Sequence, residues 1–98
     1  MVKRRKISIN KKAKDWKVRY PLVEIEWIDI CSDASWMDFD KLSKMTLPSC
    51  FTKGHLFSQK NGITRVFADT SNDDNGEIDT IGNVTILPNS VIKNIKKL

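Results

Sequence analysis

Hydrophobic and polar side chains alternate most regularly over residues 20–30. Three apolar residues, Val23, Ile25 and Trp27, are separated by two glutamates. A period of two residues is typical of a strand that buries one face, so this segment predicts the first strand of the fold. After Trp27 the apolar positions shift to Ile28, which predicts a bend or bulge near Trp27.

The next apolar residues follow a different period. Phe39, Leu42 and Met45 recur at every third position, and Asp38 stands where an N-cap residue would. This spacing behind a capping residue predicts a short helix. Pro48 restricts the residue before it to extended geometry, so the helix should end ahead of it.

The second half of the chain predicts further strands separated by turn residues. The predicted elements are strands at residues 50–58, 63–68 and 83–87 and a polar loop at residues 70–76. Asn61 and Gly62, between the first two of these strands, predict a tight hairpin turn because both residues tolerate positive φ angles. Gly54 lies inside a predicted strand and indicates a bulge there.

The last apolar residues leave two structures open. Val91, Ile92, Ile95 and Leu98 would share one face of a helix, and this pattern slightly favours the helix. Three of the four are β-branched, however, which suits a final strand.

Four segments carry a resemblance to a known group of proteins. They are residues 20–29 (YPLVEIEWID), residues 36–42, Cys50 ahead of a glycine-containing strand, and residues 86–95 (ILPNSVIKNI). Over residues 20–98 the chain resembles small bacteriophage-encoded accessory proteins, most of them of unknown function. The resemblance implies a small SH3-like or Sm-like β-barrel in which a proline-led turn separates the last two strands. On that basis residues 91–97 would be a strand.

Positive charge is concentrated at the N-terminus of a chain whose net charge is +5. Residues 1–19 hold nine basic side chains against one acid, a net +8, whereas residues 20–98 hold eight against eleven, a net −3. Residues 1–18 contain too few apolar side chains to offset the entropy of ordering, so they are predicted to form a basic, flexible arm ahead of a domain at residues 19–98. The candidate contacts to nucleic acid or another anionic partner are Arg4, Arg5, Lys6, Lys11, Lys12 and Lys14.

No residue pattern in the sequence supports catalysis or metal binding. Residues 71–79 match a calcium loop in part, but serine stands at the first ligand position and glycine at the twelfth, so we interpret them as a solvated hairpin loop. His55, Cys31 and Cys50 offer at most three zinc ligands at irregular spacing. A pair of Cys50 and His55 would also need a third, orienting group for catalysis. We therefore predict no metal, no cofactor and no enzymatic activity.

The length and composition support one folded domain. Ninety-eight residues supply one hydrophobic core, and no apolar run is long enough to cross a bilayer as a helix or to serve as a secretory signal. The expected location is the cytoplasm, that of an infected host cell if the resemblance holds. The predicted fold is mainly β: a small five-stranded SH3-like barrel with one short helix after the first long strand and a basic N-terminal arm.

The predicted function is that of a non-catalytic binding module. We expect a phage accessory protein that binds a host or viral macromolecule, with nucleic-acid binding through the N-terminal arm as the alternative. Trp16 and Trp36 have no obvious place in the predicted core, and an exposed indole can stack on a base or insert into a partner, so both are candidate partner contacts.

Overall fold

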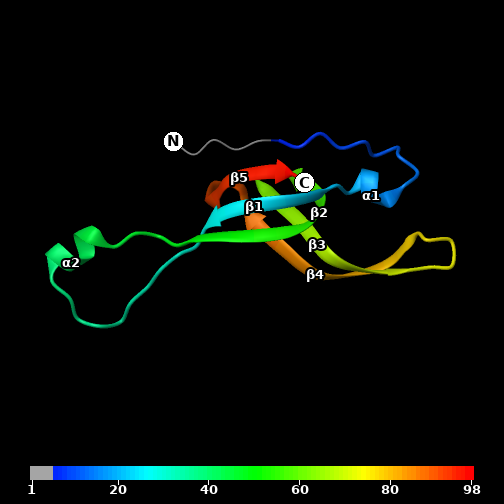
Figure 1. Ribbon diagram of the computed structural model, residues 1–98. Helices are drawn as coiled ribbons and strands as arrows, with labels where there is room; N and C mark the ends of the chain where they lie inside the picture. Colours follow the sequence, from blue (N-terminus) through cyan, green and yellow to red (C-terminus); the bar gives the residue numbers. More distant parts are fainter. Residues whose placement is uncertain (1–5) are drawn as a thin grey trace.

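Five antiparallel strands form one sheet in residues 6–98, the part of the chain that the computed structural model describes (Figure 1). The strands are β1 (Leu22–Ile28), β2 (Ser49–Lys60), β3 (Ile63–Asn72), β4 (Ile78–Pro88) and β5 (Ile92–Lys97). Short helical elements are α1 (Trp16–Arg19), α2 (Phe39–Lys44) and the 3₁₀ turn η1 (Asn89–Val91). The fold is therefore mainly β, as predicted.

The sheet is open, whereas the sequence predicted a closed barrel. Its strand order is β4-β3-β2-β1-β5, so β4 and β5 are the two edges, and no ladder joins them within residues 6–98. Ile7 and Ile9 pack against the core, so part of its cover comes from a segment without regular secondary structure. Neither barrel closure nor an SH3-like fold is confirmed.

The core lies on one face of the sheet. Its buried side chains are Val23, Ile25, Leu56, Val66, Leu87, Ile92 and Ile95. The alternation in β1 places Val23 and Ile25 on this face, as predicted. The pairing of β1 with β5 shifts register between Glu26 and Trp27, which confirms the predicted irregularity near Trp27.

The local predictions for α2 and for the Asn61-Gly62 turn are confirmed. The carboxylate of Asp38 accepts a hydrogen bond from the backbone N–H of Lys41 at 2.8 Å and caps α2. Asn61 and Gly62 have φ angles of 58° and 74° and join β2 to β3. The C-terminal ambiguity resolves as a strand, because Ile92 and Ile95 face the core from β5.

The prediction of a bulge at Gly54 is wrong. The pairing of β2 with β3 shifts between Leu56 and Ser58 instead, while β1 pairs with β2 in continuous register through Gly54. A side chain at Gly54 would place its Cβ 3.1 Å from the carbonyl oxygen of Phe67 and 3.2 Å from Cβ of Val66. Glycine is therefore needed there for close packing.

The hairpin of β3 and β4 is longer than predicted. The predicted polar loop at residues 70–76 is strand at its first three residues, because β3 continues to Asn72, and the connection to β4, which begins at Ile78, is residues 73–77. Backbone pairs such as Thr70 with Ile81 extend the ladder. The extension is held by main-chain hydrogen bonds rather than by a buried apolar face, so the hydropathy pattern does not mark it.

An aromatic cluster covers the sheet face opposite the core. His55 and Phe67 pair across β2 and β3 and lie next to core residues in each strand, so their side chains point to the other face. Trp16 packs on them, with ring centroids 5.0 Å from His55 and 6.5 Å from Phe67, and only 9% of it is exposed. The assignment of Trp16 as a partner contact is therefore corrected: it is an interior residue.

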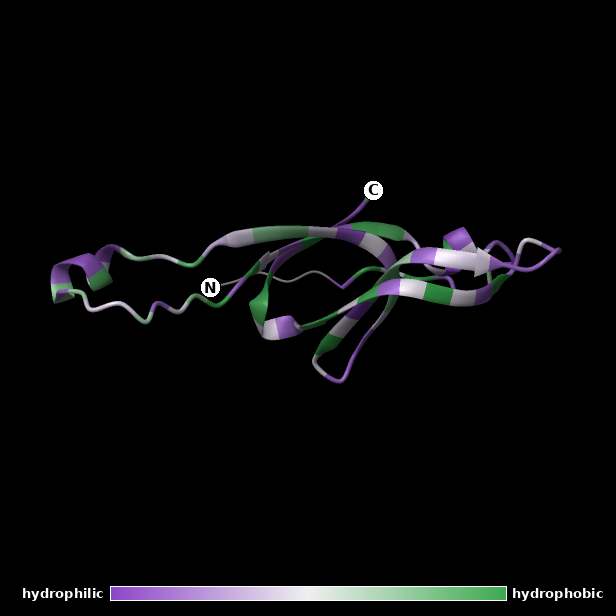
Figure 2. Cartoon of the chain, turned by 90° about the horizontal axis from the view of Figure 1, so that it is seen from below, coloured by the Kyte–Doolittle hydropathy of each residue, from purple (hydrophilic) through white to green (hydrophobic). Residues whose placement is uncertain are grey.

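The connection between β1 and β2, residues 29–48, extends far from the sheet (Figures 1 and 2). We call it the β1–β2 loop. Its base is closed by a hydrogen bond from the N–H of Asp29 to the carbonyl of Pro48 at 3.0 Å. Trp36 and Phe39, near its far end, are 101% and 90% exposed.

The described part of the chain, residues 6–98, contains no helix with the length and apolar character needed to traverse a membrane.

Candidate functional site

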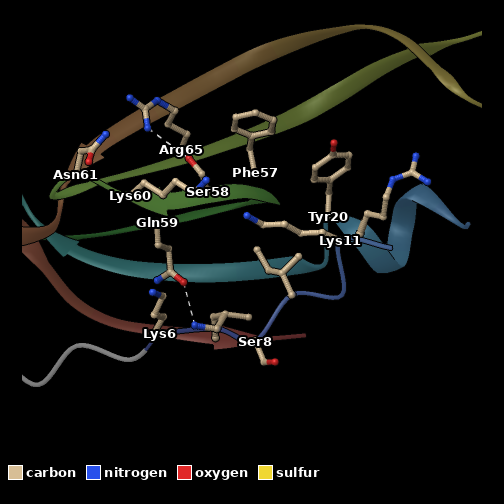
Figure 3. A pocket seen from close by; sticks show the side chains of 13 residues that line it. Lys6, Ser8, Lys11, Tyr20, Phe57, Ser58, Gln59, Lys60, Asn61 and Arg65 are labelled. Carbon is tan, nitrogen blue, oxygen red and sulfur yellow. Dashed lines mark hydrogen bonds between the residues drawn. The ribbon is translucent and has the colours of Figure 1, made fainter. Parts of the chain in front are cut away.

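A groove of about 820 Å³ opens between residues 6–11 and the β2–β3 hairpin (Figure 3). Lining it are Lys6, Ile7, Ser8, Ile9, Lys11, Arg19, Tyr20, Phe57, Ser58, Gln59, Lys60, Asn61 and Arg65. We call this site the basic groove. Its lining comes from three parts of the sequence that only the fold brings together.

Residues 6–11 are fixed against the sheet by two apolar side chains. Ile7 and Ile9 pack against the core, and the N–H of Ile7 donates a hydrogen bond to Oε1 of Gln59 at 2.9 Å. Lys6 and Lys11 are exposed at the two ends of this segment and line the groove. The packing of Ile7 and Ile9 thus places Lys6 and Lys11 beside the sheet.

Five cationic side chains and no carboxylate line the basic groove in the described structure. Arg19 alone of the five pairs with an acid, Glu77, at 3.0 Å, and this hydrogen bond raises the pKa of Arg19. Arg65 donates to the hydroxyl of Ser58 at 3.3 Å. For the three lysines and Arg65, no carboxylate of residues 6–98 lies within ion-pair distance.

Like charges meet at the centre of the groove. The Lys11 side chain extends toward Lys60 (Figure 3). The close approach of the Lys60 ammonium lowers the pKa of Lys11, with smaller contributions from desolvation and from the charge of Lys6. The fold therefore holds Lys11 close enough to a second cation to disfavour its ionisation, which is the electrostatic arrangement that a bound anion relieves.

Two aromatic rings form one wall of the groove. Tyr20 and Phe57 stack with centroids 5.8 Å apart and ring planes 28° from parallel. Phe57 lies in the β2 bulge, because Leu56 and Ser58 pair with neighbouring residues of β3 and leave Phe57 without a partner there. A bulge re-aims the side chain that it carries. Phe57 consequently stays 49% exposed at the groove.

The structure separates the cations that the sequence grouped together. Lys6 and Lys11 line the basic groove, whereas Lys12 and Lys14 are exposed outside it. Arg4 and Arg5 lie outside the described residues. Trp36, the remaining candidate contact, is in the β1–β2 loop, away from the groove.

Several groove residues were missed by sequence reasoning. They are Arg19, Tyr20, Phe57, Lys60 and Arg65. The available signal was the Asn-Gly turn: a tight hairpin opposes the residues on its two sides, so it brings Lys60 and Arg65 to one end of the sheet. The docking of residues 6–11 onto that end has no comparable sequence signal.

The residues that the sequence analysis considered for metal binding or catalysis are His55, the two cysteines and the loop around Asp73. His55 Nδ1 lies 2.9 Å from the carbonyl of Tyr20, and Cys31 and Cys50 are free thiols. Asp73 Oδ1 accepts hydrogen bonds from the N–H groups of Asn75 at 2.9 Å and Glu77 at 3.0 Å, as interpreted for a hairpin loop. Within residues 6–98, no three His, Cys, Asp or Glu side chains gather in a way that could hold a metal ion.

Comparisons with protein-family models, with curated protein sequences and with solved protein structures gave no significant match.

Proposed function

We propose that this protein is a non-catalytic binding module whose basic groove binds the phosphate backbone of a nucleic acid. The observation that carries the proposal is the set of five cations lining a groove that has no carboxylate among its described residues. A concave surface lined by one sign of charge concentrates the field and attracts a polyanion. Arg4 and Arg5 add two more charges immediately before Lys6 in the sequence.

A nucleic acid suits this groove better than a single small anion. Lys6 and Lys11 of the N-terminal segment and Lys60 and Arg65 of the β2–β3 hairpin bring four cations to the groove, more than one small anion would neutralise (Figure 3). A polymer places a phosphate opposite each cation and releases its condensed counterions on binding. The same polymer would relieve the repulsion between Lys11 and Lys60.

Salt dependence tests the number of phosphate contacts. Neutralising about four phosphates predicts a slope of log affinity against log salt near −3.6 on duplex DNA. Replacing both Lys11 and Lys60 by glutamine should make that slope less steep by about 1.8. Lys41→Gln, on α2 in the β1–β2 loop, removes a distant charge and is the control. An unchanged slope in the double variant would contradict the proposal.

A charge-conserving variant separates a built groove from non-specific attraction. Ile7→Ala removes packing that holds Lys6 and Lys11 in place and leaves the net charge unchanged. We expect weaker nucleic-acid binding from Ile7→Ala and wild-type binding from Ile30→Ala, whose side chain is exposed in the β1–β2 loop. Equal affinity for all three proteins would show that overall charge alone is responsible.

A second candidate function is favoured by the β1–β2 loop. We propose that it docks a host or viral protein, as expected of a phage accessory protein. Trp36 and Phe39 are exposed beside Asp33, Asp38 and Asp40. Tryptophan is enriched among the anchor residues of protein interfaces. The acidic neighbours suit a partner with an apolar pocket and a basic rim.

Affinity capture from a bacterial lysate tests this second function. A protein retained after nuclease treatment by the wild type and lost by Trp36→Ser would support it. Capture that disappears with nuclease in both proteins would leave only the basic groove as the binding site.

The bacteriophage resemblance also carries a proposal about the fold. The resemblance implies a proline-led turn between the last two strands. The order of Pro88, η1 and β5 along the chain supports this implication. We infer that the open sheet is a variant of the small SH3-like barrel. Hydrogen-bond scalar couplings between β4 and β5 in solution would demonstrate closure, and their absence would count against it.

A further inference from the structure

The ring of Phe57, in the aromatic wall of the basic groove, has no group that can bind phosphate. Phe57 is half exposed inside a groove otherwise rich in cations, and Tyr20 supports its ring from one side. An exposed apolar ring between lysines is a suitable surface for a flat, apolar ligand face that is attached to an anion. A nucleotide has this combination in its base and its phosphate.

We propose that the basic groove selects single-stranded nucleic acid, with an unpaired base stacked on Phe57 and the flanking phosphates held by Lys11 and Lys60. The inference rests on the proposed function and adds the class of nucleic acid. In a duplex the faces of the bases are already stacked on each other, so only edges and backbone are available to a protein. In a single strand each base can offer its face to an aromatic side chain.

The geometry favours this arrangement over simple charge attraction. Phe57 is the unpaired residue of the β2 bulge, which turns its ring to the groove side of the sheet. Figure 3 shows the rings of Tyr20 and Phe57 beside each other on one wall, with the Lys11 side chain extending across the groove near them. Arg19 lies 5.8 Å from the centre of the Tyr20 ring and adds a cation to the same wall.

The test compares two ligands and two phenylalanines by fluorescence anisotropy. The ligands are a dye-labelled oligothymidylate and a mixed-sequence duplex with the same number of phosphates per strand. Phe57→Ala should bind the single strand roughly 5- to 140-fold more weakly, the range for losing one base–aromatic stack, and should bind the duplex within twofold of wild type. Phe51→Ala is the matched control, because Phe51 lies on the same strand, is 63% exposed and does not line the groove.

Three further measurements keep the result interpretable. Phe57→Leu retains an apolar side chain without a ring and should lose single-strand affinity even if Phe57→Ala unfolds. An abasic oligonucleotide keeps the phosphates and lacks the bases, so its affinity should be weak and unaffected by either variant. Polyglutamate should not compete with the oligothymidylate at equal charge, and effective competition would indicate an acidic protein as the partner and overturn the inference.

The outcomes separate this inference from the proposed function. Equal losses on single strand and duplex, or no loss on either while Lys11→Gln and Lys60→Gln weaken both, would leave the proposed function in place and refute base stacking. Wild-type binding that favours the duplex would also refute it. Failure of every oligonucleotide to bind would refute both.

Discussion

Replacing Trp16 by alanine tests whether residues 6–19 belong to the folded body. A buried aromatic side chain removes about 150–250 Å² from water, which corresponds to about 4–6 kcal/mol at about 25 cal/mol per Å². Trp16 is 9% exposed, but α1 has four residues at the periphery and can relax into the vacated space. We therefore expect a loss of about 3 kcal/mol in the free energy of unfolding, at the low end for aromatic-to-alanine changes.

Such a loss is large for a domain of this size. Domains of about 100 residues have unfolding free energies of about 5–15 kcal/mol, and a loss of about 3 kcal/mol lowers the melting temperature by about 12–24 °C. Urea denaturation followed by far-UV circular dichroism measures the change without relying on indole fluorescence. The matched control is Trp36→Ala, which removes an equally large but fully exposed side chain and should change stability by at most about 0.5 kcal/mol.

Comparing Trp16→Ala with Trp36→Ala can refute directly the interpretation that Trp16 is buried in the folded body and that Trp36 is exposed on the β1–β2 loop. If Trp16→Ala costs less than about 0.5 kcal/mol, residues 6–19 do not contribute to the folded body. The basic groove would then lack one wall in solution. If Trp36→Ala is as destabilising as Trp16→Ala, the β1–β2 loop must pack on the sheet rather than extend from it.

Three further outcomes follow from the geometry. Lys60→Gln should raise the pKa of Lys11 toward 10.5, which NMR titration of the lysine side chains can measure. In the wild type the folded state releases the Lys11 proton at a lower pH than the unfolded state does. The stability of the wild type relative to Lys60→Gln should therefore increase as the pH rises from the lowered pKa of Lys11 to 10.5. Gly54→Ala should destabilise the protein by about 1–3 kcal/mol in urea denaturation, because its Cβ would meet backbone 3.1 Å away. Millimolar calcium should leave the melting temperature unchanged, and a rise of several degrees would contradict the assignment of Asp73 to a hairpin loop.

Sequence patterns predicted the elements that depend on local signals. The alternation in β1, the Asp38 cap of α2 and the Asn-Gly turn each reflect a constraint within a few residues, and each is present in the structure. The C-terminal strand required more, because the spacing of Ile92 and Ile95 slightly favours a helix and only their β-branched side chains favour a strand. Pairing with β1 decides between them, and that pairing is a tertiary contact that a local pattern does not contain.

The candidate site was predicted only in part, for a related reason. Lys6 and Lys11 could be singled out from charge density, whereas Phe57 reaches the groove through a bulge that involves β3. Trp16 was misassigned because its few apolar neighbours in sequence gave no sign of burial. Its actual partners, His55 and Phe67, lie on β2 and β3, far along the chain.

The docking of the N-terminal segment divides its positive charge between two roles. Lys11 is fixed in the basic groove, so a phosphate bound there would contact it directly, and its loss should act mainly by speeding dissociation. Lys12 and Lys14 are exposed outside the groove and can contribute only through the longer-range field, which falls off within about 8–10 Å at physiological salt. On the proposed function, replacing Lys12 and Lys14 by glutamine should therefore slow association with little effect on dissociation, as stopped-flow measurements can resolve. A purely flexible arm would make all three lysines equivalent, so equal effects of Lys11 and Lys12 on both rates would argue that the segment does not dock.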